Sequence, residues 1–126
     1  MITGSNMHLL KNALDASSMR QEMISSNISN VNTTGYKAKR VNFEETLKKA
    51  IDGTGMQARH PNHFGASNFN AVRPQTVEQK GNRINENGNN VAIDTEMAEL
   101  SANALYFQAV SAQLNNQYGM IRSVLR

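Results

Sequence analysis

Mostly apolar residues recur in alternating steps of three and four along two stretches of the chain, one near each end. A strict 3.5-residue period is typical of a helix that lies along another helix. Neither row can be buried by its own helix, so we expect the rows to pack on each other, on other copies of the chain or on other proteins. The N-terminal row comprises Leu10, Leu14, Ser17, Gln21, Ile24, Ile28 and Val31, and the C-terminal row comprises Ile93, Met97, Leu100, Ala104, Phe107, Ser111, Leu114, Tyr118, Ile121 and Leu125.

The N-terminal row predicts one amphipathic helix over residues 5–30. We expect this helix to end within residues 30–35, because Asn and Thr side chains compete there with helical hydrogen bonds. Gly35 can take a positive φ and so can turn the chain away from the helix axis. Residues 36–43 alternate weakly between polar and apolar side chains, which favours an extended segment.

The middle of the chain gives weaker signals. Residues 43–51 predict a short helix, which the glycines of residues 53–55 should end. The Asn-Gly pair at residues 87–88 is a two-residue turn signal. It suggests a small β-hairpin with residues 77–84 and 91–93 as its arms.

The C-terminal row predicts a long final helix that begins near Asp94 or Thr95, either of which could cap it. About 32 residues would give a rod of roughly 48 Å. Small and apolar residues form a second row beside the first, so this helix can approach more than one neighbour. The second row comprises Ala98, Ala102, Leu105, Ala109 and Ala112.

The patterns therefore predict a mainly α fold. Two long terminal amphipathic helices pair antiparallel as a coiled coil and are joined by a polar loop region that has room for a small β-hairpin. We expect residues 1–52, 53–90 and 91–126 to contribute to one core domain. Only 39% of the residues are hydrophobic and 6% are aromatic, so we expect the chain to become ordered mainly on assembly.

Composition narrows the classes of function. The formal net charge is +3 and the isoelectric point is about 9.5, but the basic residues are interspersed with acidic ones, so we expect no nucleic-acid partner. The chain has no Cys, which excludes disulfides and thiolate chemistry. Residues 1–10 do not predict a cleavable secretory signal, and no run of about 18 apolar residues predicts a membrane span.

Residue patterns for catalysis or cofactor binding are weak. His60 and His63 could bind a metal, but Pro61 disfavours a helix between them and no carboxylate lies nearby in sequence. Residues 53–58 match a dinucleotide-binding pattern by letter, without the preceding strand and following helix that it requires. We therefore expect no enzyme activity, no metal and no cofactor.

A dense set of amides and hydroxyls lies at the expected end of the first helix, in residues 26–37. Ending a helix would require only one or two such residues, so this segment predicts a joint whose backbone is satisfied by side chains or by neighbouring subunits. It resembles the N-terminal signature of bacterial flagellar axial proteins, which form the rod, hook and hook-associated structures. The residues that carry the resemblance are Asn27, Asn30, Thr33, Gly35, Tyr36 and Lys37.

The chain length and residues 89–97 resemble the proximal rod branch of that family; the chain is too short for the domains inserted in distal rod and hook proteins. The resemblance implies a structural protein that leaves the cytoplasm unfolded through the flagellar export apparatus. It further implies helical polymerisation in the periplasmic part of the basal body, where the rod transmits torque from the inner-membrane ring toward the hook. The implied partners are other copies, other rod proteins, the rod adaptor protein and the ring, with peptidoglycan nearby.

Two other interpretations follow from the sequence. A basic coiled-coil protein associated with nucleic acid would show an affinity that falls steeply with salt. A chaperone-like helical hairpin would form a stable soluble dimer at micromolar concentration.

Overall fold

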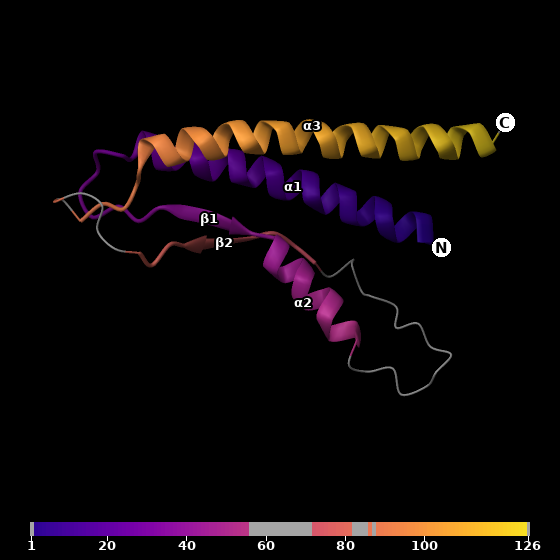
Figure 1. Cartoon of the computed structure of the whole chain (residues 1–126), viewed down its shortest axis with the longest axis horizontal. Helices are drawn as coiled ribbons and strands as arrows, with labels where there is room; N and C mark the ends of the chain where they lie inside the picture. The colour runs from indigo at the N-terminus through magenta and orange to yellow at the C-terminus, as the bar shows by residue number, and fades with distance from the viewer. Residues whose placement is uncertain (1, 56–71, 82–85, 87, 126) are drawn as a thin grey trace.

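In the computed structural model, residues 2–55, 72–81, 86 and 88–125 are described. Their helices and strands follow in the order α1, β1, α2, β2, α3 (Figure 1). The bounds of these elements are Ile2–Ser29 for α1, Lys39–Asn42 for β1, Glu44–Gly55 for α2, Gln75–Glu78 for β2 and Ile93–Val124 for α3. The chain is mainly helical, as the sequence predicts.

The two long helices α1 and α3 pack against each other and run antiparallel (Figure 1). Ser17 of α1 meets Asn103 of α3, while Asn27, further along α1, meets Glu96, which lies earlier on α3. Small residues of α1, Ala16 among them, are buried and allow other elements to approach this helix closely. The pairing of the terminal helices is therefore confirmed.

The ends of the long helices differ slightly from those expected. The helix α1 begins at Ile2 rather than at residue 5 and ends at Ser29. The helix α3 is 32 residues long, as expected, but begins at Ile93. Its cap is Ala92, which makes no side-chain hydrogen bond, so the prediction of Asp94 or Thr95 as cap is wrong.

A two-stranded antiparallel sheet lies in the middle of the chain, with Lys39 opposite Glu78 and Asn42 opposite Gln75. A small sheet is therefore present, but β2 does not pair with residues 91–93 as the predicted hairpin required; residues 82–85 and 87 of that hairpin lie outside the described residues. β2 pairs instead with β1, from which α2 separates it in sequence, and α3 already begins at Ile93. Local alternation could not reveal this pairing because the partner strand is distant in sequence.

The short helix predicted over residues 43–51 is present as α2, but it begins at Glu44 and runs on to Gly55 instead of ending before the glycines. Residues from both sides of this helix complete the core: Phe43 is 1% exposed and Val72 is 2% exposed. They form one cluster with Ala13 and Ala16 of α1. The middle of the chain thus contributes more to the core than its composition suggests.

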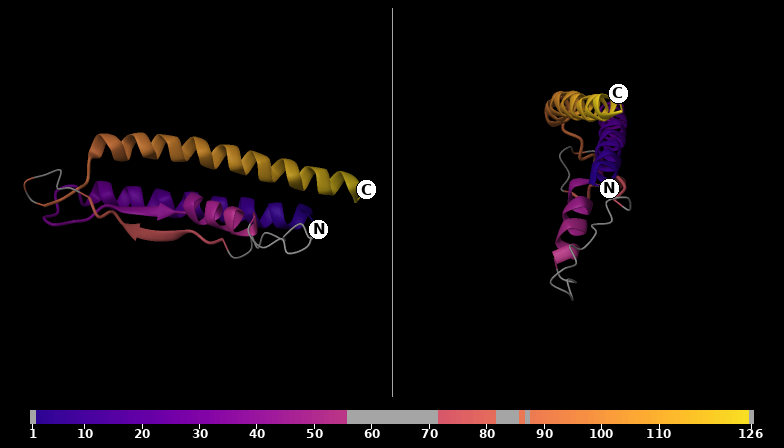
Figure 2. Two further views of the ribbon diagram at one scale, coloured as in Figure 1. Left: turned by 60° about the horizontal axis from the view of Figure 1, so that its bottom comes forward. Right: turned by 90° about the vertical axis from the view of Figure 1, so that its right-hand side faces the viewer.

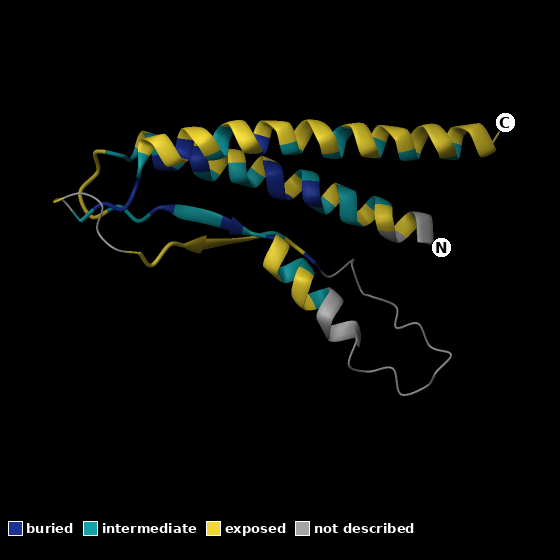
Figure 3. Ribbon diagram, viewed as in Figure 1, coloured by how far each residue is buried: buried dark blue, intermediate teal, exposed yellow. Residues whose placement is uncertain are grey.

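The helix α1 lies between α3 and the sheet (Figures 1 and 2). This central position leaves α1 with buried residues along much of its length, whereas most of the surface of α3 is exposed (Figure 3). Within the described part of the chain, no helix is both long enough and apolar enough to cross a membrane.

Candidate functional site

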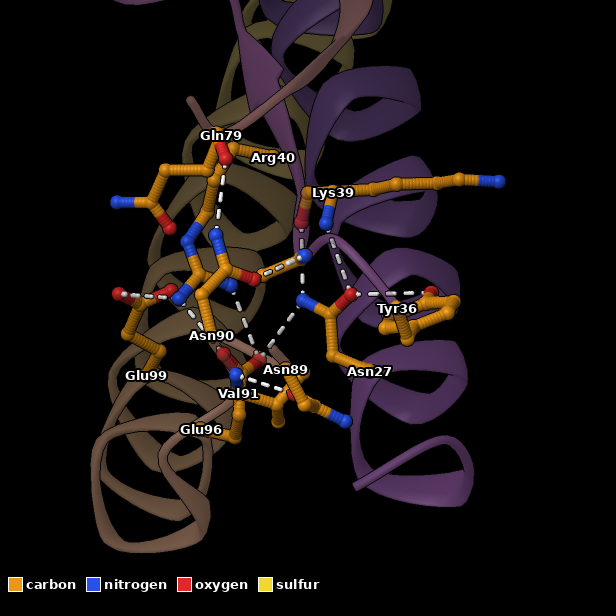
Figure 4. A network of polar contacts seen from close by, with 11 residues as sticks. Asn27, Tyr36, Lys39, Arg40, Gln79, Asn89, Asn90, Val91, Glu96 and Glu99 are labelled. Atoms are coloured by element: carbon orange, nitrogen blue, oxygen red, sulfur yellow. Dashed lines mark hydrogen bonds and ion pairs between the residues drawn. The ribbon is translucent and has the colours of Figure 1, made fainter. Parts of the chain in front are cut away.

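The predicted joint lies where the end of α1, the start of β1 and the start of α3 come together (Figure 4). Asn27 is fully buried at the centre of this region. Its amide donates hydrogen bonds to the carbonyl oxygen of Lys39 at 2.9 Å and to Oε2 of Glu96 at 3.0 Å. Its Oδ1 accepts from the N–H of Lys39 at 2.9 Å and from the hydroxyl of Tyr36 at 3.3 Å. One side chain therefore links α1 to β1 and to α3.

Glu96 is also fully buried and pairs with Arg40 of β1. The guanidinium of Arg40 donates to both carboxylate oxygens, at 3.0 and 2.6 Å, and lies 3.6 Å from Oε1 of Glu99. These hydrogen bonds to Glu96 raise the pKa of Arg40, against an opposing effect of burial, and the charges of Glu96 and Glu99 raise it further. A buried carboxylate is tolerated when it is paired and hydrogen-bonded in this way.

Asn89 binds the turn that follows α1 from a distant part of the chain. Its amide group lies 2.9, 2.9 and 3.0 Å from the carbonyl oxygens of Asn30, Val31 and Thr33. Its Oδ1 accepts from the N–H of Val91 at 2.7 Å. These carbonyl groups belong to the turn that follows α1, which ends at Ser29, so Asn89 fixes this turn against the segment that leads into α3.

The neighbouring residue Asn90 joins the start of β1 to the end of β2. Its Oδ1 accepts from the N–H of Ala38 at 2.7 Å, and its amide donates to the carbonyl oxygen of Gln79 at 2.9 Å. Lys37 donates from Nζ to the carbonyl oxygen of Gly88 at 3.0 Å. The segment 88–91 is thus bound to the joint along its length.

The remaining residues of the predicted joint interact mostly among themselves. Asn30 donates to the carbonyl oxygen of Ser26 at 2.8 Å, and Thr33 donates to Oδ1 of Asn30 at 3.1 Å. The hydroxyls of Ser26 and Tyr36 share a hydrogen bond of 3.1 Å. Gly35 has a φ of 72°, which confirms the predicted positive value.

The predicted N-terminal row lies partly against the rest of the molecule. Ile24 is buried, and Leu10, Leu14, Ile28 and Val31 are half-buried. The most deeply buried face of α1 also includes residues that the row does not contain, namely Ala13, Ala16 and Asn27.

The predicted C-terminal row does not lie continuously against α1. Ile93, Met97, Phe107 and Tyr118 are 47%, 53%, 43% and 51% exposed, and Ala104 is also exposed. Leu100, Leu114 and Ile121 are half-buried. The inward side of α3 also includes residues outside the predicted row, namely Glu96, Asn103, Tyr106 and Val110, of which Glu96 and Asn103 are fully buried.

Polar contacts continue along the helix pair beyond the joint. Ser17 donates to Oδ1 of Asn103 at 2.9 Å, and the amide of Asn103 donates to the carbonyl oxygen of Ser17 at 3.0 Å. A third contact joins that amide to Oε1 of Gln21 at 3.3 Å. Arg20 lies 5.9 Å from the centre of the Tyr106 ring, a cation–π contact.

The sequence patterns did not single out Asn89, Asn90, Glu96 or Asn103 as site residues. Asn89 and Asn90 look like turn residues, and Glu96 looks like an acid placed to favour a helix N-terminus. The spacing of seven between Glu96 and Asn103 would have indicated one helix face. Only their distant partners show that these side chains are buried contacts.

The candidate metal ligands His60 and His63 lie outside the described residues. Among the residues that the structure describes, no three His, Cys, Asp or Glu side chains are grouped so that they could hold a metal ion. Gly53 and Gly55, which begin the dinucleotide-like pattern, lie within α2. They are therefore not in the strand-to-helix turn that binds a dinucleotide.

Comparison with known proteins shows what the chain is similar to. A family model described as "Flagella basal body rod protein" matches residues 7–37, which include most of α1 and the joint. The flagellar basal body rod protein FlgB of Bacillus subtilis is 32% identical over 120 residues, covering 92% of this chain and 89% of that protein. FlgB of Borreliella burgdorferi is 31% identical over 121 residues, covering 90% of each chain.

The paired terminal helices and the matched joint define the class, the rod proteins of the flagellar basal body. The similarity extends over nearly the full length of the Bacillus protein as well as of this chain. The chain belongs to the FlgB family of flagellar basal body rod proteins.

Proposed function

We propose that the chain is a structural subunit of the proximal rod of the bacterial flagellum, where it polymerises within the basal body. The observation that carries the proposal is the 32% identity to the FlgB protein of Bacillus subtilis over 92% of the chain. Family membership replaces the nucleic-acid-associated and chaperone-like interpretations. The role is mechanical rather than catalytic.

The exposed apolar residues of α3 support assembly as the mode of action. Met97 and Phe107 are 53% and 43% exposed. Burying the exposed part of such a side chain against a neighbour would contribute on the order of 1 kcal/mol. Repeated along α3 and over several neighbours, these contributions would hold a subunit in a tube. The proteins that pack against the exposed apolar residues of α3 are other copies of the chain and other rod proteins.

The joint supports the transmission of torque. Asn27, Glu96 and Asn89 connect α1, β1 and α3 through buried hydrogen bonds, so these elements should move as one body under load. The same contacts favour residues 1–52, 53–90 and 91–126 acting as one core domain. A rigid subunit transmits torque from the inner-membrane ring toward the hook with little elastic deformation.

The finer partners follow from the family resemblance. The chain is exported unfolded through the flagellar export apparatus and assembles in the periplasm, close to peptidoglycan. It contacts the rod adaptor protein and the inner-membrane ring at one end, and other rod proteins at the other.

Mass spectrometry of purified basal bodies tests the proposal. The chain should copurify with rod proteins from a strain arrested before hook completion, in an amount that corresponds to several copies per basal body. Its absence from basal bodies that contain a complete rod would refute the proposal.

A further inference from the structure

Residues of both predicted heptad rows meet at one groove. The groove has a volume of about 390 Å³ and lies between α1 and α3. Ser17 and Gln21 of the N-terminal row line it, and so do Ala104 and Phe107 of the C-terminal row. Two exposed polar residues complete its rim, Ser18 of α1 and Gln108 of α3.

A second cleft follows the C-terminal row toward the free ends of the two helices. It has a volume of about 220 Å³, and its lining includes Leu114 and Tyr118 of α3 with Met7 and Lys11 of α1. Tyr118 is 51% exposed. The row repeats along α3 at the spacing with which one helix packs along another, so a third helix could lie over both clefts.

The exposed surface of α3 beside these clefts is poor in charge. Between Glu99 and Arg122 the helix contains no Asp, Glu, Lys or Arg, although most of its residues there are exposed. A helix that faces water ordinarily carries charged residues on that side. This surface therefore suits another uncharged surface, and it offers no opposite charge to a strongly acidic or basic partner.

The same helix presents a ridge that suits the groove. The second row predicted from the sequence is exposed at Ala98, Ala102, Leu105, Ala109 and Ala112, and Leu105 is 68% exposed. At 100° per residue, this row lies roughly 150° around α3 from the row that lines the groove. Leu105 is the only large side chain of the row, and the alanines beside it allow a close approach to a facing helix.

We propose that the groove between α1 and α3 receives α3 of a second copy, with Leu105 of that copy beside Phe107. Both surfaces are uncharged, and both repeat in steps of three and four residues. Ridge and groove lie on different sides of the subunit, so the contact repeats from copy to copy instead of closing into a symmetric pair. The inference rests on the proposed function, for which it identifies the surfaces that join neighbouring copies.

Cross-linking between two versions of the full chain tests this contact, because the native chain has no Cys. A strain that lacks the native gene carries one version with Leu105→Cys and another with Ser18→Cys, and its purified basal bodies are treated with a short bismaleimide. A covalent dimer of the chain should form. In the control, Ser29→Cys replaces Ser18→Cys. Ser29 is also exposed and lies roughly 16 Å further along α1, so the dimer should be lost.

An exchange of charge tests the same contact without cross-linking. Leu105→Glu should lower the amount of the chain in basal bodies about ten-fold or more, because its carboxylate would be buried in the groove without a counter-ion. Adding Ser18→Lys gives each carboxylate a cation from the neighbouring copy, so most of the native amount should return. Ser29→Lys, the matched control, should not restore it. All three positions are exposed, and immunoblots of whole cells verify equal expression.

Three results would overturn the proposed contact. They are equal yields of dimer from the two cysteine pairs, a link from Leu105→Cys only to a different rod protein, and no advantage of Ser18→Lys over Ser29→Lys. If the native chain is present in basal bodies, any of these results leaves the proposed function standing and removes only this contact. Absence of the native chain from basal bodies would refute both.

Discussion

Arg40 and Glu96 are 56 positions apart in sequence, yet they form a bidentate ion pair with distances of 3.0 and 2.6 Å between guanidinium nitrogens and carboxylate oxygens. The side chain of Glu96 is 1% exposed and that of Arg40 is 24% exposed. This pair fixes β1 against the first turn of α3, and Asn27 adds α1 to the same contact. The elements that meet at the joint are thus held by charge and hydrogen bonds more than by apolar packing.

Replacing Arg40 with Met should destabilise the fold severely. The change leaves Glu96 buried without its counter-ion, which costs about 3–5 kcal/mol in comparable buried pairs. Arg40→Lys should be milder but still harmful, because Lys retains the charge and loses the planar fork. Urea unfolding in osmolyte buffer, followed by circular dichroism, measures both variants. Lys49→Met, which breaks an exposed pair with Glu45, should have little effect; an equal loss would contradict the account.

Asn89→Asp should loosen the end of α1. A carboxylate cannot donate a hydrogen bond, and it would lie against the carbonyl oxygens of Asn30, Val31 and Thr33. The carbonyl oxygens of Asn30 and Thr33 keep their backbone partners Thr33 and Tyr36, so the loss should be about 1 kcal/mol, mainly from the lost donor and the repulsion between oxygens. Amide hydrogen exchange over residues 30–38 should accelerate in Asn89→Asp and stay unchanged in Asn32→Asp, which alters an exposed side chain.

Two glycines should respond to substitution in opposite directions. Gly35→Val should destabilise the joint by about 1–2 kcal/mol, because its φ of 72° is strained for a β-branched residue. No heavy atom lies within 4 Å of an added Cβ there, so the cost comes from the backbone and not from a clash. Gly119→Ala in α3 should instead stabilise the helix by about 1 kcal/mol. Wild-type assembly of Gly35→Val would show that the joint tolerates another backbone conformation.

Phe107→Asp should block assembly and leave the single chain intact. Phe107 is 43% exposed, so a carboxylate at this position can reach water in the free subunit but would be buried against a neighbour. Leu100→Asp should also block assembly, with additional damage to the subunit because Leu100 is half-buried. Swimming assays and immunoblots distinguish failed assembly from loss of the protein. Asn115→Asp, an exposed change on the same helix, serves as the control, and normal motility of Phe107→Asp would argue against an assembly surface there.

The isolated chain should be only partly helical in plain buffer. The described core is small; its buried apolar residues include three alanines and one phenylalanine, and long helices without full partners are marginal in water. Circular dichroism should give a weak helical signal that rises with osmolyte and melts without a sharp transition. A strong signal with a cooperative melt would contradict this expectation.

The sequence was sufficient to predict the two long helices, since each carries its own periodic row. It also predicted the positive φ of Gly35, because the residues around it terminate a helix. Only part of the inward side of α3 could be predicted in this way, namely Leu100, Leu114 and Ile121. Local periodicity selected Met97 and Phe107, whereas the partners that hold Glu96 and Asn103 inward lie on α1 and β1.

The small sheet illustrates the same limit. An Asn-Gly turn signal is local and suggested a hairpin, but β2 pairs with β1 from the other side of α2. Asn90 supports this arrangement by bonding to Ala38 beside β1 and to Gln79 beside β2. In the sequence alone, a residue that makes such a long-range contact is only a polar residue that looks like part of a loop.

Electron microscopy of basal bodies from a strain that lacks this gene tests the central claim most directly. A proximal rod subunit is needed before any more distal part can assemble. The account predicts basal bodies that stop at the inner-membrane ring, with neither rod nor hook. Intact rods that carry hooks and filaments would contradict it.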